Sequence, residues 1–403
     1  MPPPVTQERQ NTGTGGGGPL EDIVVLDLSR VLTGPYAGMM LGDLGARVIK
    51  VERPGAGDDT RAWGPPFVGP EDAQESTYYL SANRNKESIV LDFRDPDDLE
   101  TLLRLVRQAD VLVENFRPGV LDRLDLGMER LHAENPRLVI LSITGFGHDG
   151  PEAGRPGYDQ ILQGEAGLMS FTGPPGQPTK VGTAIADILA GMFGTSGVLA
   201  ALHERERTGR GRVVRTSLLA AVVGVHAFQG TRWLVAGEVP DPIGNRHPIV
   251  SPYGAFRCKD GIVQIGAGSP RLWERFAELI GIDLADPRFA TNGDRVENYE
   301  DLEREIGERL ASDTIAHWLE ACDAAGVPAG EVKPLDRVYE SEQVHSQGLV
   351  LEVDHPVLGA IRLPGPPIRF DGGGRTEHLA PPTLGEHTEA VLRWLDEREA
   401  APE

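Results

Sequence analysis

Short apolar runs alternate with longer amphipathic segments along the first half of the chain. Five runs rich in Val, Ile and Leu predict buried strands, at 23–28, 46–51, 88–91, 109–114 and 138–143. A helix is expected at 35–44, and another from Asp95, where acidic residues precede basic ones. Strands that alternate with helices predict an α/β layer built on a mostly parallel sheet.

The pattern changes near residues 235–255, where Pro, Gly and Asn become frequent. This stretch predicts a linker into a second unit, with a strand at 261–265 and helices near 270–281, 298–311 and 313–325. Residues 348–370 are extended and β-rich, and a last amphipathic helix is expected after Gly385. At the other end, the Pro-, Thr- and Gly-rich residues 1–19 predict a disordered tail.

Composition narrows the classes of function. The chain has 403 residues, with 39 Lys and Arg against 61 Asp and Glu, and a net charge of −22. Such an acidic chain argues against general binding to nucleic acid or to an anionic membrane, so an anionic ligand would need a local basic pocket. The chain has two cysteines, Cys258 and Cys322. A single disulfide could not stabilise a fold of this length, so the low cysteine count favours a reducing compartment. Residues 1–19 lack the apolar stretch of a secretion signal, and no uncharged apolar run reaches the ~18 residues of a membrane helix, so a soluble cytoplasmic protein is expected.

Several familiar catalytic patterns are missing. The turn after the first predicted strand, 28–35, lacks the G-x-G-x-x-G of nicotinamide-binding folds, and Pro35 removes a backbone donor that a pyrophosphate would need. The chain has no G-x-S-x-G motif and no H-x-x-x-H pair. These absences disfavour a nicotinamide enzyme, an α/β-hydrolase and a zinc site.

Arginines follow the predicted strand ends. They are Arg53 and Arg61 after the second strand, Arg94 after the third, and Arg117 and Arg123 after the fourth. Ligands of open α/β sheets bind outside the carboxyl ends of the strands, so these guanidinium groups suggest a phosphate-rich ligand. Ordinary solvated surface charge would give the same spacing.

The segment 181–194 predicts a helix with Asp187 in or near its first turn, among small residues that allow close backbone approach. An Asp at a helix start is commonly a cap or a partner of the helix dipole. The same position is expected to lower the pKa of the carboxyl and keep it ionised at neutral pH. An ionised carboxylate in a tight apolar site can also act as a nucleophile.

Nine segments, in order over residues 20–395, resemble the class III CoA-transferases of the CaiB/BaiF type, the family of formyl-CoA transferase and carnitine CoA-transferase. They are V-L-D-L-S-R-V-L-T-G-P (25–35), L-G-A-R-V-I-K-V-E-R-P-G-x-G-D (44–58), N-R-N-K-x-S-I-x-L-D (83–92), A-D-V-L-V-E-N-F-R-P-G-V-L-D-R-L (109–124), R-P-G-Y-D (155–159), A-D-I-L-A-G (186–191), T-G-R-G (208–211), G-N-R-H-P (244–248) and L-G-E-H-T (384–388). Their order and spacing over the whole chain carry the resemblance.

The resemblance implies a fold and an assembly. A large Rossmann-like domain is made from both chain ends, a smaller α+β domain is inserted, and two subunits interlace as a homodimer. The expected division is a tail at 1–19, the first part of the large CoA-binding domain at 20–230, linkers and the small domain at 231–335, and a return to the large domain at 336–403.

The resemblance also implies roles for particular residues. Asp187 matches the family's catalytic aspartate. The positions that hold CoA match Val31, Arg53, Leu91, Arg94, Asn115, Phe116, Arg123 and Arg155. Arg can bind phosphates bidentately, Phe116 offers a stacking surface and Asn115 can contact an amide or hydroxyl of the carrier. CoA is a substrate in this family, and no tightly bound cofactor or metal is expected.

The implied reaction transfers CoA from an acyl-CoA thioester to a carboxylic acid through an aspartyl-CoA thioester on Asp187. Tyr158 and Asp159 are expected to line the acyl or acceptor pocket. Arg246 or His247 is expected to contact the acceptor carboxylate; the alternative is that both only structure the linker turn.

Two other functions stay open. The 2-methylacyl-CoA racemases resemble the chain over the same length and pair the aspartate with a histidine in R-x-G-H-D. Tyr158 stands at that histidine position, and a phenol with a pKa near ~10 is a poor base at neutral pH, which favours the transferase. A non-catalytic CoA-binding dimer would be supported by loss of the nucleophile, and Asp187 is present.

Overall fold

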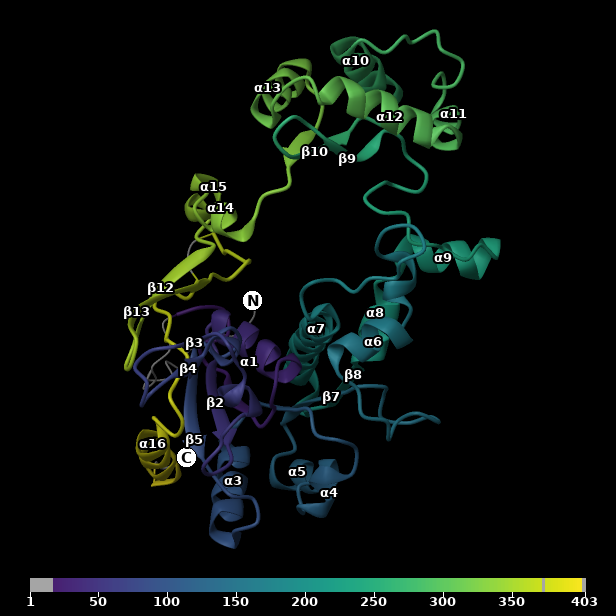
Figure 1. Cartoon of the computed structure of the whole chain (residues 1–403). Coiled ribbons are helices and arrows are strands. Elements are labelled where there is room, and N and C mark those ends of the chain that lie inside the picture. Colours follow the sequence, from purple (N-terminus) through teal and green to yellow (C-terminus); the bar gives the residue numbers. More distant parts are fainter. Residues whose placement is uncertain (1–16, 372–373, 401–403) are drawn as a thin grey trace, which may run out of the picture. The chain divides into compact units, whose positions relative to one another are not determined.

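The computed structural model describes residues 17–371 and 374–400 (Figure 1). Residues 1–16 of the expected tail lie outside the described part of the chain. The chain divides into two compact units, the first from Met1–Gly167, Gly182–Gly230 and Gln343–Glu403 and the second from Leu168–Val181 and Thr231–Glu342.

A six-stranded parallel sheet forms the centre of the first unit. Its strands are β1 (Val24–Asp27), β2 (Arg47–Glu52), β5 (Lys86–Val90), β6 (Val111–Glu114), β7 (Val139–Thr144) and β8 (Val213–Ser217). Their order in space is β5-β2-β1-β6-β7-β8, and every neighbouring pair is parallel. The chain moves outward from β1 to β5, returns across β1 to β6 and continues to β8. The expected α/β class with a parallel sheet is confirmed, and the strand order reverses between β1 and β6.

The five strands expected from apolar runs are β1, β2, β5, β6 and β7. Nearly all of their residues are buried, because helices cover both faces of the sheet. The sixth strand, β8, was not expected. Its sequence V-V-R-T-S carries the exposed Arg215 and is only partly buried, so it lacks the continuous apolar run of the others.

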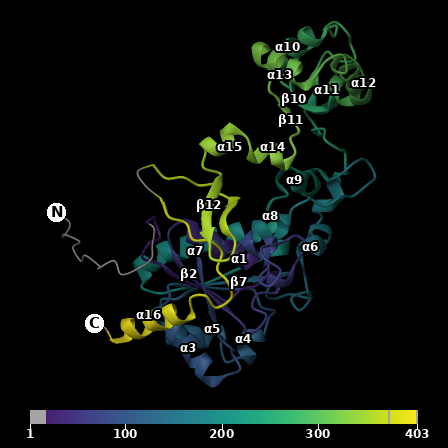
Figure 2. The same cartoon turned by 60° about the vertical axis from the view of Figure 1, so that its left-hand side comes forward.

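Helices α3 (Pro96–Gln108), α5 (Met128–Glu134) and α16 (Thr388–Ala400) cover one face of the sheet. Leu102 of α3 and Val391 of α16 are fully buried in the same apolar cluster as the strands. Figures 1 and 2 both show α16 beside α3, so the end of the chain packs against its first third.

Helices α1 (Thr33–Asp43) and α7 (Ile185–Thr208) cover the other face and pack against each other. Leu141 of β7 points to α7, where it lies against Gly194, whereas the preceding Ile140 belongs to the cluster under α3. This alternation follows from the strand geometry, in which successive side chains point to opposite faces.

Within residues 17–371 and 374–400, one helix is long and apolar enough to span a bilayer by composition, and a bent helix pair passes the same test if it is taken as one span. The helix is α7, and the pair is α8 (Leu218–Gly224) with α9 (Ala227–Ala236), which are bent by 78° at their junction. Half of the most apolar stretch of α7 is buried within the protein, where it contacts α1, α8, β7 and β8. Its burial in the covering layer of the sheet accounts for this apolar sequence.

The edge strand β5 is completed by the end of the chain. The His387 N–H donates to Ser88 O at 2.9 Å, and the Gly385 N–H donates to Ser88 Oγ at 2.9 Å. The Val90 N–H donates to Thr388 Oγ1 at 3.3 Å. These bonds satisfy polar groups that an uncovered edge would leave open.

Shorter elements complete the first unit. They are β3 (Phe67–Val68), β4 (Glu75–Ser76), α2 (Thr77–Leu80), α4 (Val120–Arg123), α6 (Asp159–Glu165), and the antiparallel hairpin β12 (Val350–His355) and β13 (Gly359–Pro364). The hairpin accounts for the extended pattern expected at 348–370. Helix α15 (Glu342–Ser346) lies at the boundary of the two units.

The second unit is a small α+β fold. Its antiparallel sheet contains β9 (Tyr253–Arg257), β10 (Ile262–Gly266) and β11 (Ala329–Glu331) in the order β11-β10-β9. Its helices include α10 (Pro270–Ile280), α11 (Asn292–Glu297), α12 (Tyr299–Leu310), α13 (Ile315–Ala325) and α14 (Leu335–Tyr339). Buried Trp273, Phe276 and Trp318 join sheet and helices in one apolar core. The expected strand and three expected helices are observed as β10, α10, α12 and α13.

Candidate functional site

A cavity of about 670 Å³ lies in the first unit at the carboxyl ends of the parallel strands. Its wall comes from the residues that follow β1, β2, β5 and β6, together with the last residues of β7 and the first turn of α7. The chain leaves β1 for one covering layer and β6 for the other, so a crevice opens between these neighbours. Ligands of doubly wound sheets bind at this kind of switch point.

The cavity brings together most of the residues predicted from the sequence. Its lining includes Val31, Arg53, Leu91, Arg94, Asn115, Phe116, Arg155, Tyr158 and Asp187. Arg123 at the end of α4 and Asp159 at the start of α6 are not part of the lining. Arg246 and His247 lie in the second unit.

The predicted nucleophile, Asp187, is buried in the first turn of α7, with 8% of its surface exposed. Thr33, the first residue of α1, donates a hydrogen bond from its hydroxyl to Asp187 Oδ1. Close packing of the two helices makes this contact possible, because a Cβ on Gly191 would lie 2.9 Å from the Thr33 carbonyl oxygen. The small residues predicted for this segment therefore hold the carboxylate against α1.

The pKa of Asp187 is raised to about 6, mainly because burial disfavours its charged form; the Thr33 hydrogen bond opposes this and Asp159 adds to it. The expectation that the helix start would lower this pKa is wrong, because desolvation outweighs the helix terminus. A carboxyl with this pKa is still mostly ionised at pH 7.

The capping function considered for Asp187 belongs to Asp159. The Ala186 N–H in the first turn of α7 donates to Asp159 Oδ1 at 2.8 Å, and Gln163 Nε2 donates to Asp159 Oδ2 at 2.8 Å. The Asp159 carboxylate therefore holds the start of α7 in place, and Asp187 is left to face the cavity.

Arginines in the cavity wall pair with carboxylates of the same loops. Arg53 lies 2.6 Å from Asp59, and Arg94 lies 2.8 Å from Asp92. Arg155 pairs with Glu152 and Glu165. Across the lining, six Lys and Arg stand against five Asp and Glu, so the cavity lacks the negative excess of the whole chain.

Arg61 is not a ligand-facing cation. Its guanidinium lies 2.7 Å from Glu52 and donates to the hydroxyl of Tyr79 and the carbonyl of Pro382. The side chain is nearly buried beneath the wall, where it ties β2 to the end of the chain. By contrast, Arg117 lines the cavity and makes no ion pair with any of the described residues.

Asn115 shapes the wall through the backbone of the facing loop. Its Oδ1 accepts the Arg30 N–H at 2.9 Å, and its Nδ2 donates to Arg30 O at 2.6 Å. The guanidinium of Arg30 lies over the ring of Phe116 at 5.4 Å from the centroid. The Asn115 amide therefore holds the loop after β1 and the loop after β6 together across the crevice.

Sequence reasoning missed two residues close to Asp187. One is Thr33, which lies inside the resembling segment 25–35. The other is Tyr78, whose pKa is raised to about 12 by burial and by the charges of Asp187, Asp159 and Asp58. Its hydroxyl therefore stays protonated at neutral pH. The sequence around Tyr78 gave no sign of this proximity, which depends on the tertiary fold.

A smaller hollow of about 180 Å³ lies in the second unit and is lined by Arg246, His247 and Tyr299, among others. Arg246 lies over the ring of Tyr299 at 4.7 Å from the centroid, and His247 stacks on Tyr253. Across the described ranges, no carboxylate forms an ion pair with Arg246. Nor do three His, Cys, Asp or Glu side chains in those ranges come together as a metal site.

These features define a doubly wound α/β protein with a ligand crevice and a buried carboxylate at its switch point. The model of CoA-transferase family III matches residues 20–388, so the chain belongs to that family. It is an enzyme of acyl-CoA metabolism that uses CoA thioesters as substrates.

Named relatives support this assignment. The chain is 41% identical over 378 residues to succinyl-CoA:glutarate CoA-transferase of Mus musculus, covering 93% of this chain and 86% of the relative. It is 39% identical over 391 residues to acetyl-CoA:oxalate CoA-transferase of Acetobacter aceti, covering 96% and 97%. A crystal structure of a CaiB/BaiF family protein from Brucella suis matches with a TM-score of 0.86 and 39% identity, covering 94% of this chain and all of that one.

The raised pKa of Asp187 predicts a pH-dependent effect on stability. Its folded pKa of about 6 exceeds the ordinary 3.8, so ionisation costs the folded state free energy above about pH 6 and nothing below about pH 4. Asp187→Asn removes this cost and keeps an oxygen for Thr33. We expect the variant to be more stable than the wild type by roughly 1–3 kcal/mol near pH 8, with no gain near pH 4, in urea unfolding.

Asp97→Asn is the matched control, because Asp97 is an exposed acid in the first turn of α3. Its loss removes a favourable interaction with the helix dipole and lowers stability by about 0.3–1 kcal/mol. Equal behaviour of the two variants at both pH values would contradict the account of Asp187.

Proposed function

We propose that this enzyme moves CoA from an acyl-CoA donor to a carboxylic acid through a covalent thioester on Asp187. The observation that carries the proposal is the placement of a buried, hydrogen-bonded carboxylate in a cavity otherwise rich in guanidinium groups. The phosphates of CoA suit those cations, and its thioester end would extend toward Asp187. Burial excludes water that would hydrolyse the reactive intermediates.

In the first half-reaction, an Asp187 oxygen attacks the thioester carbonyl, a C–O bond forms, and the C–S bond breaks to release CoA thiolate. The product is a mixed anhydride. The thiolate then attacks the Asp187 carbonyl, and the original acyl group leaves as a carboxylate. The enzyme is left as an aspartyl-CoA thioester.

In the second half-reaction, the acceptor carboxylate attacks the aspartyl carbonyl and displaces the thiolate, which gives a second anhydride. The thiolate attacks the acceptor's acyl carbon, and the Asp187 carboxylate leaves. The new acyl-CoA keeps the thioester bond, so the sequence of steps needs no oxidant and no ATP. A desolvated carboxylate is a stronger nucleophile than a hydrated one, which makes the burial of Asp187 useful here.

CoA would contact the residues predicted for it. Arg53 and Arg94 would bind phosphate groups, each exchanging an aspartate partner for the ligand. Val31, Leu91 and Phe116 would give the apolar surface for the adenine or pantetheine, and Arg155 a further cation. Asn115 would act by shaping the wall, since Arg30 occupies both ends of its amide.

The covalent intermediate is tested by trapping. After incubation with succinyl-CoA and then hydroxylamine, we expect a hydroxamate on the peptide that contains Asp187, detected by mass spectrometry. Asp187→Ala removes the adduct and lowers kcat by at least about 10³-fold, because the nucleophile is lost. Asp72→Ala, which removes an exposed carboxylate of the same unit, is the control and should keep both the hydroxamate adduct and the wild-type kcat.

No adduct with any acyl-CoA donor would overturn the covalent mechanism. If solvent deuterium then appeared at the α-carbon of a 2-methylacyl-CoA, the racemase would replace it. CoA binding without either reaction would leave only a binding protein.

We also propose a dicarboxylate acceptor, recognised through Arg246 or His247. The named relatives act on glutarate and oxalate, both dicarboxylates. Arg246 lines a hollow of the second unit together with Asp241, and it forms no ion pair with a carboxylate in the described part of the chain. A second carboxylate of the acceptor suits such a guanidinium. Tyr158, at the cavity wall, would contact the acyl group.

Arg246→Gln tests this proposal. We expect the KM for the dicarboxylate to rise at least about tenfold and the KM for the acyl-CoA donor to change less than about threefold. Arg257→Gln, at an exposed position of β9 in the same unit, is the control and should change neither. An unchanged KM for the acceptor would leave Arg246 a structural residue of the linker.

We propose further that the enzyme is an interlaced homodimer. Met192, Phe193 and Leu199 on α7 and Val223 on α8 expose large apolar side chains on the first unit. Such a face is typical of a protein interface.

We expect the mass in sedimentation to be twice that of the chain. Phe193→Lys should shift it toward the single chain, because a charge would be buried. Val68→Lys, at an exposed apolar position of β3, is the control and should leave it unchanged. A single-chain mass for the wild type would contradict the dimer.

A further inference from the structure

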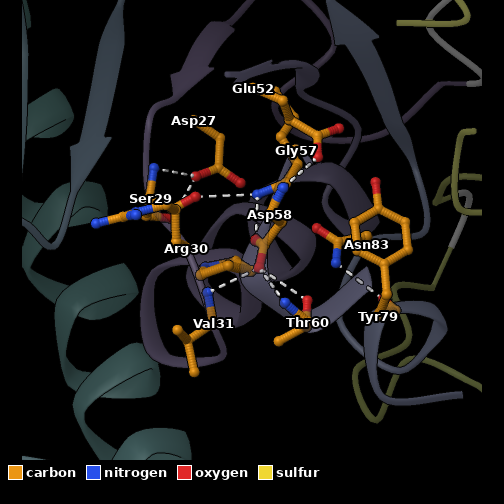
Figure 3. A network of polar contacts seen from close by, with 12 residues as sticks. Asp27, Ser29, Arg30, Val31, Glu52, Gly57, Asp58, Thr60, Tyr79 and Asn83 are labelled. Carbon is orange, nitrogen blue, oxygen red and sulfur yellow. Dashed lines mark hydrogen bonds and ion pairs between the residues drawn. The ribbon is translucent and has the colours of Figure 1, made fainter. Parts of the chain in front are cut away.

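Two buried ion pairs hold the loop from β1 to α1 in place. Lys86 Nζ lies 2.8 Å from Asp27 Oδ2, and Lys50 Nζ lies 2.9 Å from Asp58 Oδ2. All four side chains are completely buried. Figure 3 shows Asp27 beside Ser29 at the start of this loop and Asp58 beside Val31.

The first pair holds the start of the loop. Asp27 Oδ1 accepts the backbone N–H of Ser29 at 3.0 Å and the hydroxyl of the same residue. Lys86 Nζ donates to the carbonyl of Pro35 at 2.8 Å, on the far side of the loop. The pair therefore ties β1 to the first turn of α1.

The second pair holds the middle of the loop. Asp58 Oδ1 accepts the Val31 N–H at 3.2 Å, and Lys50 Nζ donates to Ser29 O at 3.0 Å (Figure 3). Asp58 is itself oriented by the N–H and hydroxyl of Thr60, at 3.0 and 2.8 Å. Burial alone would raise the pKa of Asp58, but the charge of Lys50 and the Thr60 bonds lower it, so the carboxylate stays ionised.

The residue held by Asp58 has a strained backbone. Val31 has a φ of 72°, in the left-handed region. Among non-glycine residues with positive φ in the described ranges, it is the only β-branched one, the side-chain type least suited to that region. A strained residue keeps such a conformation only when its surroundings impose it. The bonds from Asn115 to Arg30 and from Asp58 to Val31 supply that constraint.

This conformation sets two parts of the site at once. It directs Val31 into the cavity wall, and it fixes where α1 begins two residues later. Thr33, at that first position of α1, donates to Asp187. A relaxed Val31 would therefore move the wall and the hydroxyl that contacts the carboxylate.

We propose that Asp58, neutralised by Lys50, is a positioning residue that holds Val31 in its left-handed conformation and thereby shapes the CoA cavity. The link to CoA rests on the proposed function; the hold on the loop does not. Replacement of buried ion pairs by apolar residues is commonly tolerated in protein cores. A pair whose remaining bonds go to the loop backbone has a different task, which is to fix a conformation that the sequence itself disfavours.

A cycle of four proteins tests the proposal: wild type, D58N, V31G and D58N/V31G. Glycine adopts a φ of this sign without strain, so in the V31G variant the hydrogen bond to Asp58 is no longer needed to hold the loop conformation. D58N leaves a single oxygen for both the Val31 N–H and Lys50, so we expect it to raise the rate of deuterium uptake in the peptide spanning residues 28–36 at least tenfold. In the V31G background the same change should raise it less than threefold. The cost of losing the Val31 side chain is common to V31G and D58N/V31G, so it cancels when these two proteins are compared.

CoA affinity by titration calorimetry is the second readout. D58N should weaken CoA binding at least tenfold in the wild-type background and less than threefold in the V31G background. Asp72→Asn, which neutralises an exposed acid of the same unit, is the control and should leave both readouts near the wild type. If D58N does not fold because Lys50 is left unpaired, K50M/D58A, which removes both charges and the oxygen that accepts the Val31 N–H, takes its place in the same cycle.

Equal effects of D58N in the two backgrounds, in deuterium uptake, would overturn the positioning role and leave Asp58 a general support of the core. A second outcome would also overturn the proposal: D58N changes deuterium uptake in the wild-type background only, but leaves CoA affinity unchanged. Asp58 would then hold Val31 without shaping the CoA cavity. Failure of the wild type to bind CoA would reject the proposed function, while deuterium uptake would still decide whether Asp58 holds Val31.

Discussion

The need to satisfy buried backbone groups where β1 and β6 diverge governs the structure around the site. In the middle of the β1–α1 loop, the backbone groups of Ser29, Arg30 and Val31 make no hydrogen bond to the backbone of a neighbouring strand or helix among the described residues. Unpaired polar groups are costly in such a place. The partners of Ser29, Arg30 and Val31 are instead side chains: Asp27 of β1, Lys50 of β2, Asp58 of the loop after β2 and Asn115 after β6. The divergence of β1 and β6 that opens the crevice therefore also creates the need for the ionic residues beneath it.

The position of Asp187 follows from a second close contact on the same helix. Gly191 lets α7 approach the start of α1 so closely that a larger side chain would meet the Thr33 carbonyl oxygen. The carboxylate is therefore shielded from water and meets a hydroxyl rather than a cation. Shielding raises its pKa, and the resulting balance keeps it ionised at neutral pH but poorly solvated. A nucleophile that must attack and later leave is served by this intermediate basicity.

Much of this was predictable from the sequence, and the misses have physical reasons. Continuous apolar runs located five strands, whereas β8, with its exposed Arg215, had no such run. The order of motifs located Asp187 and most of the cavity lining. The pKa direction of Asp187 was not predictable, because its burial depends on helix packing through Gly191. Arg61 looked like the cations that line the cavity, yet it pairs with Glu52 and reaches Pro382, 321 positions away.

The dependence of β5 on the far end of the chain affects how the protein is made. Residues 385–388 and helix α16 cover this edge strand, and they leave the ribosome after all six strands of the sheet. Until then, the sheet that carries the cavity presents an open edge able to pair with another nascent chain. The first unit can complete its edge only after the second has been synthesised. Removal of residues 385–400 would thus expose an aggregation-prone strand in addition to removing a surface helix, and assistance by a chaperone would matter most before this segment emerges.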